Sequence, residues 1–402
     1  MHKAGRLMYT VAMHLAIDAR LQAYRAGGIS EHIACLIDGL AELAPPERIL
    51  VLTHRRARLA GTHVPTGPNL EFARLFTPPH NRFEGLTLPL ELMFKRLSLL
   101  HSPDTVSPRF WHRASVVTVH DLAFVRYPEF LTADSARYYR GVYGAVQRAH
   151  RVIAVSDYTR RELETLTAVR SERIRVIPNS VHPRYRGNES NGTDDKGGPA
   201  ATLPDVLARY GLTAPYILFV STIEPRKNIG TLLEAYRLLM ERGCTLPLVL
   251  VGGDGWKSEP VYRQVEQLGL NGRAHFLGYV PHVDLAALYR GAAVLAHPAL
   301  DEGFGLTPLE AMASGTPAVV ADAGSLPEVT ADAALHVAPH DVRAWAAALE
   351  RVLTDKSLAR QLSEAGRARS GAYTVARMAG ATLDVYREAR AEWMAERVRS
   401  AM

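Results

Sequence analysis

The stretch Asp301-Glu302-Gly303-Phe304-Gly305-Leu306-Thr307-Pro308-Leu309-Glu310 is the most informative part of this 402-residue sequence. It follows an apolar run at 293–296 and contains a glycine-rich turn. It therefore predicts the end of a strand, a tight loop, and a helix that begins at Thr307 with Pro308 in its first turn. Thr307 and Glu310 also have the spacing of a capping box. A strand that leads through a short loop into a helix is the repeating unit of an α/β fold with a parallel sheet.

The same alternation of short apolar runs and amphipathic stretches continues in both directions along the chain. Between the two halves, 185–203 is rich in Gly, Asn, Asp and Ser, which is typical of a surface linker. We expect two Rossmann-like, doubly wound domains at 1–183 and 214–375, with a linker at 184–213 and C-terminal helices at 376–402. Ligands of such sheets bind at the carboxyl ends of the strands, so we expect a binding cleft that both domains face. The predicted strands are 15–18, 49–53, 115–119, 151–155, 175–177, 216–221, 248–251, 274–277, 293–296 and 318–321.

Composition limits the classes of protein to which the chain can belong. It contains no run of the roughly 18 apolar residues that a membrane-spanning helix needs, and Met1–Met13 lacks the features of a secretory signal. These observations predict a soluble cytoplasmic protein. The two cysteines, Cys35 and Cys244, lie far apart in expected helices, which favours buried side chains over a disulfide or a metal site.

The net charge of +6 is concentrated in the first half of the chain. Residues 1–183 contain 24 Lys and Arg against 16 Asp and Glu, whereas the remainder contains 23 against 25. A basic half indicates an anionic partner, which could be a nucleotide, a nucleic acid or a membrane surface. A nucleic acid is disfavoured because no recognised module and no alternation of aromatic and basic residues is present.

The loop 303–306 and the two glutamates that flank it predict a ligand site. Gly303, Phe304, Gly305 and Leu306 lead into a helix whose first N–H groups and positive dipole end suit a diphosphate. Glu302 has no helix end to cap, and its carboxylate suits recognition of sugar hydroxyls. Glu310 has two possible interpretations, since it could bind ribose hydroxyls or complete the capping box.

A second group of polar residues follows the strand 216–221. Ser221 ends the run, and Arg226 and Lys227 precede Asn228, which we expect to cap the next helix. By themselves, Arg226 and Lys227 are best interpreted as solvated surface cations. At the carboxyl end of a strand, however, they would clamp a diphosphate and neutralise its charge as it departs.

The first half contributes His120 and a glycine pair. His120 follows the strand 115–119, and the neighbouring Asp121 either orients it or caps the next turn. Gly27 and Gly28 form a turn before a helix at 31–43 that Ser30 is expected to cap. A lone histidine or a lone glycine pair has little specificity, so these residues gain weight only in combination with the others.

Taken together, these segments resemble family 4 of the retaining glycosyltransferases, from about Leu15 to Ala372. Glu302 and Glu310 match the family's two glutamates separated by seven residues, and Glu224-Pro225-Arg226-Lys227-Asn228 matches its diphosphate-binding segment. Val119-His120-Asp121-Leu122-Ala123-Phe124 matches the segment whose histidine lies beside the donor sugar. The resemblance implies a GT-B fold, in which Glu302 binds the sugar hydroxyls, Glu310 the ribose, and Arg226 and Lys227 the diphosphate.

The resemblance also implies the roles of several further residues and the chemistry. Tyr279 and Val280 would line the base pocket, and Gly27 and Gly28 would lie against the donor phosphates. Ser221 departs from the family, because many relatives have glycine there. The implied reaction retains the anomeric configuration through front-face attack, without a cofactor. The absence of Asp-x-Asp and of a metal-spaced cluster in the sequence predicts a metal-free site.

The identity of the substrates follows only loosely from the sequence. The Glu-Pro-Arg-Lys-Asn segment favours GDP-mannose over UDP-sugars as the donor, and the family implies a saccharide or lipid-linked saccharide as the acceptor. A membrane-borne acceptor would suit peripheral attachment to the inner face of the cell membrane through Lys95, Arg96, Arg109, Trp111 and Arg113. The alternative to membrane attachment is that these basic residues form a solvated surface. The alternatives to a glycosyltransferase are a sugar-nucleotide epimerase or phosphorylase on the same fold and a non-catalytic sugar-nucleotide-binding protein.

Overall fold

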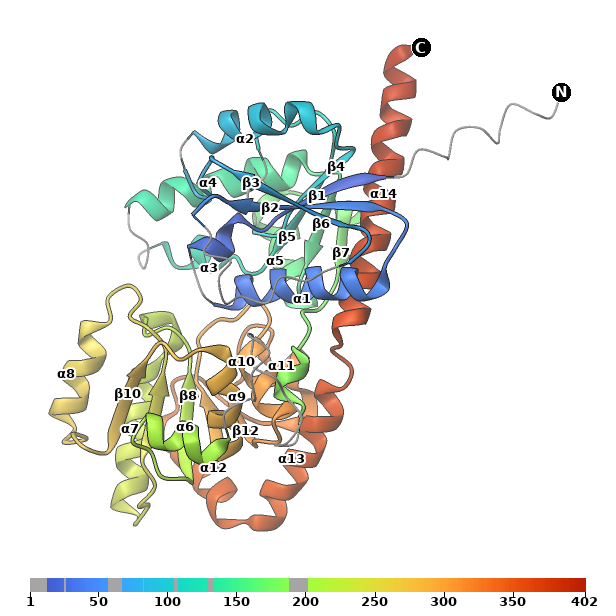
Figure 1. Cartoon of the computed structure of the whole chain (residues 1–402). Coiled ribbons are helices and arrows are strands. Elements are labelled where there is room, and N and C mark those ends of the chain that lie inside the picture. The colour runs from blue at the N-terminus through green and yellow to red at the C-terminus, as the bar shows by residue number, and fades with distance from the viewer. Residues whose placement is uncertain are drawn as a thin grey trace. The chain divides into compact units, whose positions relative to one another are not determined.

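The computed structural model describes residues 13–24, 27–56, 67–81, 83–104, 108–128, 133–187 and 202–402 (Figure 1). The chain forms two compact units, each built from segments that are distant in the sequence. Unit 1 lies within Met1–Leu122, Thr132–Ser180 and Val375–Met402, and unit 2 within Ala123–Leu131 and Val181–Thr374. The chain therefore returns to its first unit after completing the second.

Unit 1 contains a seven-stranded parallel sheet in the order β3-β2-β1-β4-β5-β6-β7. The inner strand β5 is a nearly continuous apolar run with all six residues buried, as is typical of a parallel strand covered on both faces, whereas the edge strand β3 is partly exposed. The order reverses between β1 and β4, which is the switch point of the sheet. The strands are β1 His14–Asp18, β2 Arg48–His54, β3 Leu70–Leu75, β4 Leu99–Ser102, β5 Ala114–Val119, β6 Arg151–Ala154 and β7 Ile174–Val176.

The helices of unit 1 include one from the far end of the chain. Figure 1 shows α1 beside α14, and the two share one core with the sheet. Gly39 allows this close approach, because a Cβ there would lie 2.7 Å from the Cβ of Ala379. The helices are η1 Arg20–Ala23, α1 Gly28–Leu43, α2 Glu84–Leu92, η2 Met93–Lys95, α4 Ala133–Arg148, α5 Asp157–Thr167, η4 Ser171–Arg173 and α14 Val375–Ala401.

Unit 2 contains a six-stranded parallel sheet in the order β10-β9-β8-β11-β12-β13, with its switch point between β8 and β11. Its strands are β8 Tyr216–Val220, β9 Leu248–Val251, β10 Ala274–Gly278, β11 Ala292–His297, β12 Ala318–Ala321 and β13 Leu335–Val337. Its helices are α3 Ala123–Arg126, η5 Pro183–Tyr185, α6 Leu203–Arg209, η6 Pro225–Lys227, α7 Ile229–Glu241, α8 Glu259–Gln267, α9 His282–Gly291, α10 Leu306–Ala313, α11 Leu326–Thr330, η7 Ala331–Ala333, α12 Val342–Thr354 and α13 Lys356–Ser370.

The two doubly wound sheets confirm the expected fold class, while several local expectations need revision. Part of the expected linker is helical, because Thr202 and Asp205 form a capping box that begins α6. Within that linker, 188–201 lies outside the described residues. Cys35 is buried and Cys244 half-buried, and the described residues contain no disulfide between them. Among the described helices, none is both long and apolar enough to cross a bilayer.

Candidate active site

The segment after β8 brings two cations to the switch point of unit 2. Pro225 begins η6, and Asn228 ends it in the left-handed region with φ of 53°. Asn228 occupies the N-cap position of α7, as expected, but its side chain accepts no backbone N–H of the helix. Its amide instead donates to the carbonyl oxygens of Pro298 at 3.1 Å and Pro339 at 2.7 Å. These bonds hold the segment that carries Arg226 and Lys227 against the loop after β11, which contains Pro298, and the loop after β13, which contains Pro339.

Glu302, in the loop after β11, accepts contacts from three basic side chains. Lys227 Nζ forms an ion pair with Glu302 Oε1, and His297 Nε2 lies 3.0 Å from the same oxygen. Arg226 is more distant: one guanidinium nitrogen lies 4.0 Å from Glu302 Oε2 and 3.0 Å from the carbonyl oxygen of Asp301. The structure therefore brings together Glu302, Arg226 and Lys227, as the sequence predicted, and adds His297.

These contacts fix the protonation state of both partners. Burial alone would raise the pKa of Glu302, but Lys227, the hydrogen bond from His297 and Arg226 outweigh it and hold that pKa well below its usual range. Burial lowers the pKa of His297 despite the neighbouring carboxylate. Glu302 is therefore an anion and His297 a neutral ring that donates from Nε2. The other ring nitrogen, Nδ1, is buried without a hydrogen-bond partner among the described residues.

Glu310 does not form the expected capping box. Helix α10 begins at Leu306, after Gly305 at φ 91°, so Thr307 is already its second residue and no side chain caps it. Glu310 is 4% exposed, and one of its carboxylate oxygens accepts a hydrogen bond from the Tyr289 hydroxyl at 2.8 Å. The capping interpretation of Glu310 is therefore wrong, and its proposed role at the ribose stays a prediction.

The loop 303–306 has little spare room. A Cβ on Gly305 would lie 2.7 Å from Leu326, and one on Gly324 would lie 2.6 Å from the carbonyl oxygen of Glu302. The Phe304 ring is buried against Tyr373 with centroids 5.7 Å apart, so only the backbone of Phe304 is available to a ligand. The loop thus presents its main chain at the start of α10, as anion binding requires.

The remaining predicted residues of unit 2 lie at the same edge of its sheet. The amide of Ser221 donates to the carbonyl of Val251 at 2.9 Å, and Gly252 packs closely against the Ser221 backbone. Tyr279 is 58% exposed after β10, whereas the neighbouring Val280 is buried. The exposed Tyr279 ring can contact a base, while Val280 can contribute only main-chain groups.

The predicted residues of unit 1 gather at its own switch point. Gly27, at φ 147°, precedes α1, which begins at Gly28; Ser30 lies inside the helix and is not its cap, contrary to expectation. His120 follows β5, and its Nε2 lies 2.8 Å from the carbonyl oxygen of Pro103. Burial lowers the pKa of His120 although nearby oxygens oppose it. The neutral ring donates from Nε2, which leaves Nδ1 as an acceptor.

His32, on the second turn of α1, completes the unit 1 cluster. Its ring meets that of His120 edge-on with centroids 4.8 Å apart. Burial lowers the pKa of His32 well below its usual range, and the adjacent Asn179 side chain opposes that shift. Ser180 Oγ is buried without a hydrogen-bond partner among the described residues. Buried polar atoms without partners are costly, so this end of the sheet is shaped for polar ligand groups.

Comparison with known proteins identifies the family. Residues 209–369 match the family model described as Glycosyl transferases group 1, and residues 26–185 match the model described as Glycosyltransferase Family 4. The chain belongs to glycosyltransferase family 4. It is 37% identical over 262 residues to O-antigen chain mannosyltransferase B of Escherichia coli, a match that covers 64% of this chain and 66% of that protein.

Other relatives extend the comparison with this glycosyltransferase. Serotype-specific mannosyltransferase WbdA of E. coli is 32% identical over 66% of the chain, which spans only 32% of WbdA. Among solved structures, sucrose-phosphate synthase from Thermosynechococcus elongatus matches with a TM-score of 0.74 at 22% identity, covering 94% of this chain and all of that one. WaaG, involved in lipopolysaccharide biosynthesis, matches at 0.71 with 16% identity, covering 93% and 99%. These likenesses confirm the GT-B fold.

The sequence interpretation did not single out three residues that the structure places beside the predicted ones: His297, Tyr289 and His32. His297 was not predicted because it ends a strand and belongs to no recognisable motif. Its position five residues before Glu302 could nevertheless have indicated that the two side chains lie close together. Tyr289 and His32 lie on helices, where a single polar residue is usually structural. Among the described residues, no three His, Cys, Asp or Glu side chains gather as they would around a metal ion.

Proposed function

We propose that this glycosyltransferase moves a mannosyl residue from GDP-mannose, with retention of configuration, to a saccharide or lipid-linked saccharide in cell-envelope polysaccharide synthesis. The observation that carries the proposal is the group of Lys227, Arg226 and His297 around the ionised Glu302, at the switch point of unit 2. The names of the E. coli relatives support mannose as the transferred sugar.

In the proposed reaction, the diphosphate lies against the start of α10 and the two cations. Main-chain N–H groups of 303–306 and the helix dipole hold the phosphates, and Arg226 and Lys227 stabilise the negative charge that develops as the sugar–phosphate bond breaks. The ion pair between Lys227 and Glu302 keeps the proposed phosphate-binding cation next to the proposed sugar-binding carboxylate.

Glu302 would accept hydrogen bonds from hydroxyl groups of the donor sugar. An anionic carboxylate is a strong acceptor, and the low pKa of Glu302 keeps it in that state. His120, neutral with Nδ1 available, would accept a hydrogen bond from another sugar hydroxyl. The acceptor hydroxyl attacks from the side of the leaving group, and a phosphate oxygen takes its proton.

The donor is tested by ligand-induced stabilisation. We expect GDP-mannose to raise the unfolding temperature more than UDP-glucose or ADP-glucose, since a ligand at 100 times its dissociation constant adds about 2.7 kcal/mol. If only a UDP-sugar raises the unfolding temperature, the donor is a UDP-sugar and the GDP-mannose proposal is wrong.

Turnover is tested by substitution and chelation. Glu302→Ala and Lys227→Ala should each reduce mannosyl transfer about a hundredfold or more without unfolding the chain. The matched control is Arg237→Ala, which removes an exposed cation paired with Glu241 on α7. Activity should also survive EDTA; loss that manganese or magnesium restores would contradict the metal-free proposal.

We propose that the protein acts at the cytoplasmic face of the cell membrane. A lipid-linked acceptor would be presented there, and the basic first half of the chain suits an anionic bilayer surface.

A further inference from the structure

Helix α2 of unit 1 is apolar on two opposite sides. Its inner side buries Leu88 and Leu92 in a core cluster with β2 and β4. Its outer side, continued by η2, carries the α2 stripe, which consists of Phe83, Leu86, Leu90, Met93 and Phe94. These five side chains are 54%, 53%, 55%, 54% and 84% exposed. Their spacing places them on one side of the helix, where a water-facing helix is normally polar.

Positive charge borders the α2 stripe. Lys95 and Arg96 follow it directly and are exposed, and the exposed Arg109 lies against the helix, since a Cβ on Gly85 would be 3.5 Å from Arg109 Cβ. The two acids of α2 are engaged elsewhere in the unit. Glu84 pairs with the buried Arg20, and Glu91 accepts from the amides of Phe76 and Thr77.

We propose that the α2 stripe inserts into the interface of an anionic lipid bilayer, with Lys95, Arg96 and Arg109 on the headgroups. An apolar face bordered by cations is the pattern of helices that lie in the plane of a membrane. A second copy of the chain fits this surface poorly, because a twofold contact would bring the same cations together. The proposal deepens the proposed function, which requires access to a lipid-linked acceptor.

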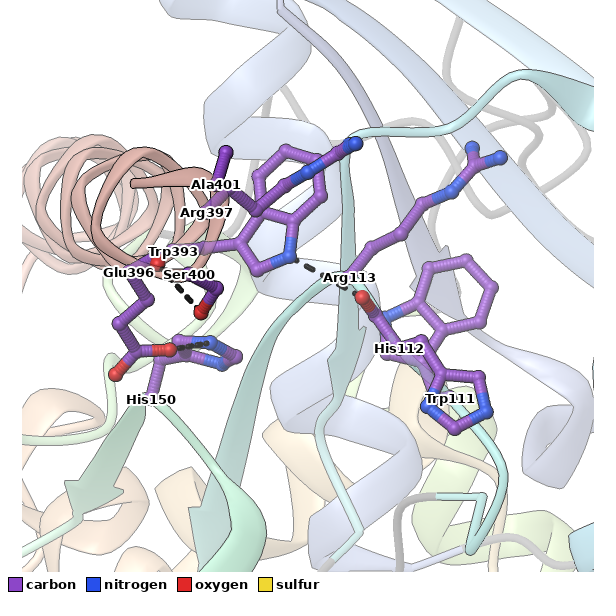
Figure 2. Close-up of a pocket in the computed structure, with 9 residues that line it drawn as sticks. All are labelled: Trp111, His112, Arg113, His150, Trp393, Glu396, Arg397, Ser400 and Ala401. Carbon is purple, nitrogen blue, oxygen red and sulfur yellow. Dashed lines mark hydrogen bonds and ion pairs between the residues drawn. The ribbon is translucent and has the colours of Figure 1, made fainter.

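Hydrogen bonds and packing hold the segment 109–113, which lies beside the stripe, against the rest of unit 1. Trp111 donates from Nε1 to Ala114 O at 2.9 Å and packs against the core beneath α2, and Arg113 donates to the carbonyl of Leu97. Figure 2 shows Trp393 of α14 directed at the main chain of His112, with Nε1 and O 3.1 Å apart. Trp111 and Arg113, expected at the membrane, are thus partly buried and instead support the loop that carries Arg109 and Phe110.

Vesicle co-sedimentation of the full-length protein tests the proposal. We expect binding to phosphatidylcholine vesicles that contain phosphatidylglycerol, much less to phosphatidylcholine alone, and a decrease as salt rises. Leu90→Ser with Phe94→Ser should weaken binding about tenfold or more. The matched control, Leu43→Ser with Phe72→Ser, removes a leucine and a phenylalanine that are 42% and 40% exposed elsewhere in unit 1, and should bind like the wild type.

Two further measurements make the outcome decisive. Transfer to a soluble saccharide acceptor should be unchanged in Leu90→Ser with Phe94→Ser. If the wild type itself fails to transfer, that result contradicts the proposed function but not the vesicle-binding result, because the two are measured separately. Sedimentation velocity reports self-association. If the stripe variant binds vesicles like the wild type, or if it only dissociates a dimer, the membrane proposal is overturned.

Discussion

Glu302 is where the polar groups of unit 2 converge, and its ionisation links the site to stability. Because Lys227, His297 and Arg226 lower its pKa below the unfolded value, the ion pairs stabilise the fold above that value. The stabilisation is lost as pH falls towards the folded-state pKa. We predict that Glu302→Gln is less stable than the wild type at pH 7, and that the difference shrinks below about pH 4.5. Urea unfolding between pH 3.5 and 7 measures it; a difference independent of pH would contradict the assignment.

His297 acts through Glu302, so it is a positioning residue. It is 1% exposed, stacks near Phe219 with centroids 6.4 Å apart, and donates to the carboxylate that would hold the sugar. We predict that His297→Ala lowers kcat about tenfold or more, and that His297→Gln, which keeps a donor near Nε2, recovers much of the loss. Because burial keeps His297 neutral, the wild-type pH profile should show no step from it between pH 6 and 8.

The control for His297 is its unfolding temperature. A purely structural role would lower stability equally in the alanine and glutamine variants and would leave kcat unchanged once folded protein is counted. Recovery of kcat by glutamine without recovery of stability separates positioning from packing.

Gly305 precedes the first residue of α10, so its conformation determines where the helix begins and the geometry of the loop 303–306. Its φ of 91° is strained for any residue with a Cβ, and that Cβ would lie 2.7 Å from Leu326 Cδ2, which would have to shift. We predict that Gly305→Ala costs about 1–3 kcal/mol of unfolding free energy and weakens donor binding, because the main-chain N–H groups shift. Calorimetry with and without the donor measures both effects, with Gly253→Ala, in open space, as the control.

The sequence predicted the elements better than their ends. Apolar runs such as β8 and β11 were recognisable because strands buried on both faces need little polar alternation. The start of α10 was misplaced by one residue, where Leu326 packs against Gly305. Asn228 was correctly placed at the N-cap of α7, but its side chain bonds to Pro298 and Pro339 instead of to the helix. The positions of Glu302, Arg226 and Lys227 after strands predicted that they lie together, which the structure bears out, while their roles stay predictions. His297 was not predicted, because only the fold brings it to the carboxylate.

At the scale of the molecule, the least predictable feature was the return of α14 to unit 1. Helical spacing in 376–402 predicted helices but gave no partner for them. The structure pairs α14 with α1 and buries Tyr386, whose hydroxyl lies 2.7 Å from Nδ1 of His101 on β4. Burial lowers the pKa of His101 to about 3, so this contact is between neutral groups at physiological pH.

The α1–α14 contact makes a prediction with an internal control. Alanine usually stabilises a helix interior by about 0.5–1 kcal/mol relative to glycine, so Gly380→Ala, with no atom within 4 Å of its new Cβ, should raise the stability of unit 1. Gly39→Ala has the same gain in propensity, but its Cβ would lie 2.7 Å from Ala379 and 2.8 Å from Val375. The two helices must then separate, so we predict a net loss of about 1–3 kcal/mol. Hydrogen exchange of the α1 and α14 amides distinguishes unit 1 from unit 2, and equal stabilisation by both substitutions would show that α14 does not pack on α1 as described.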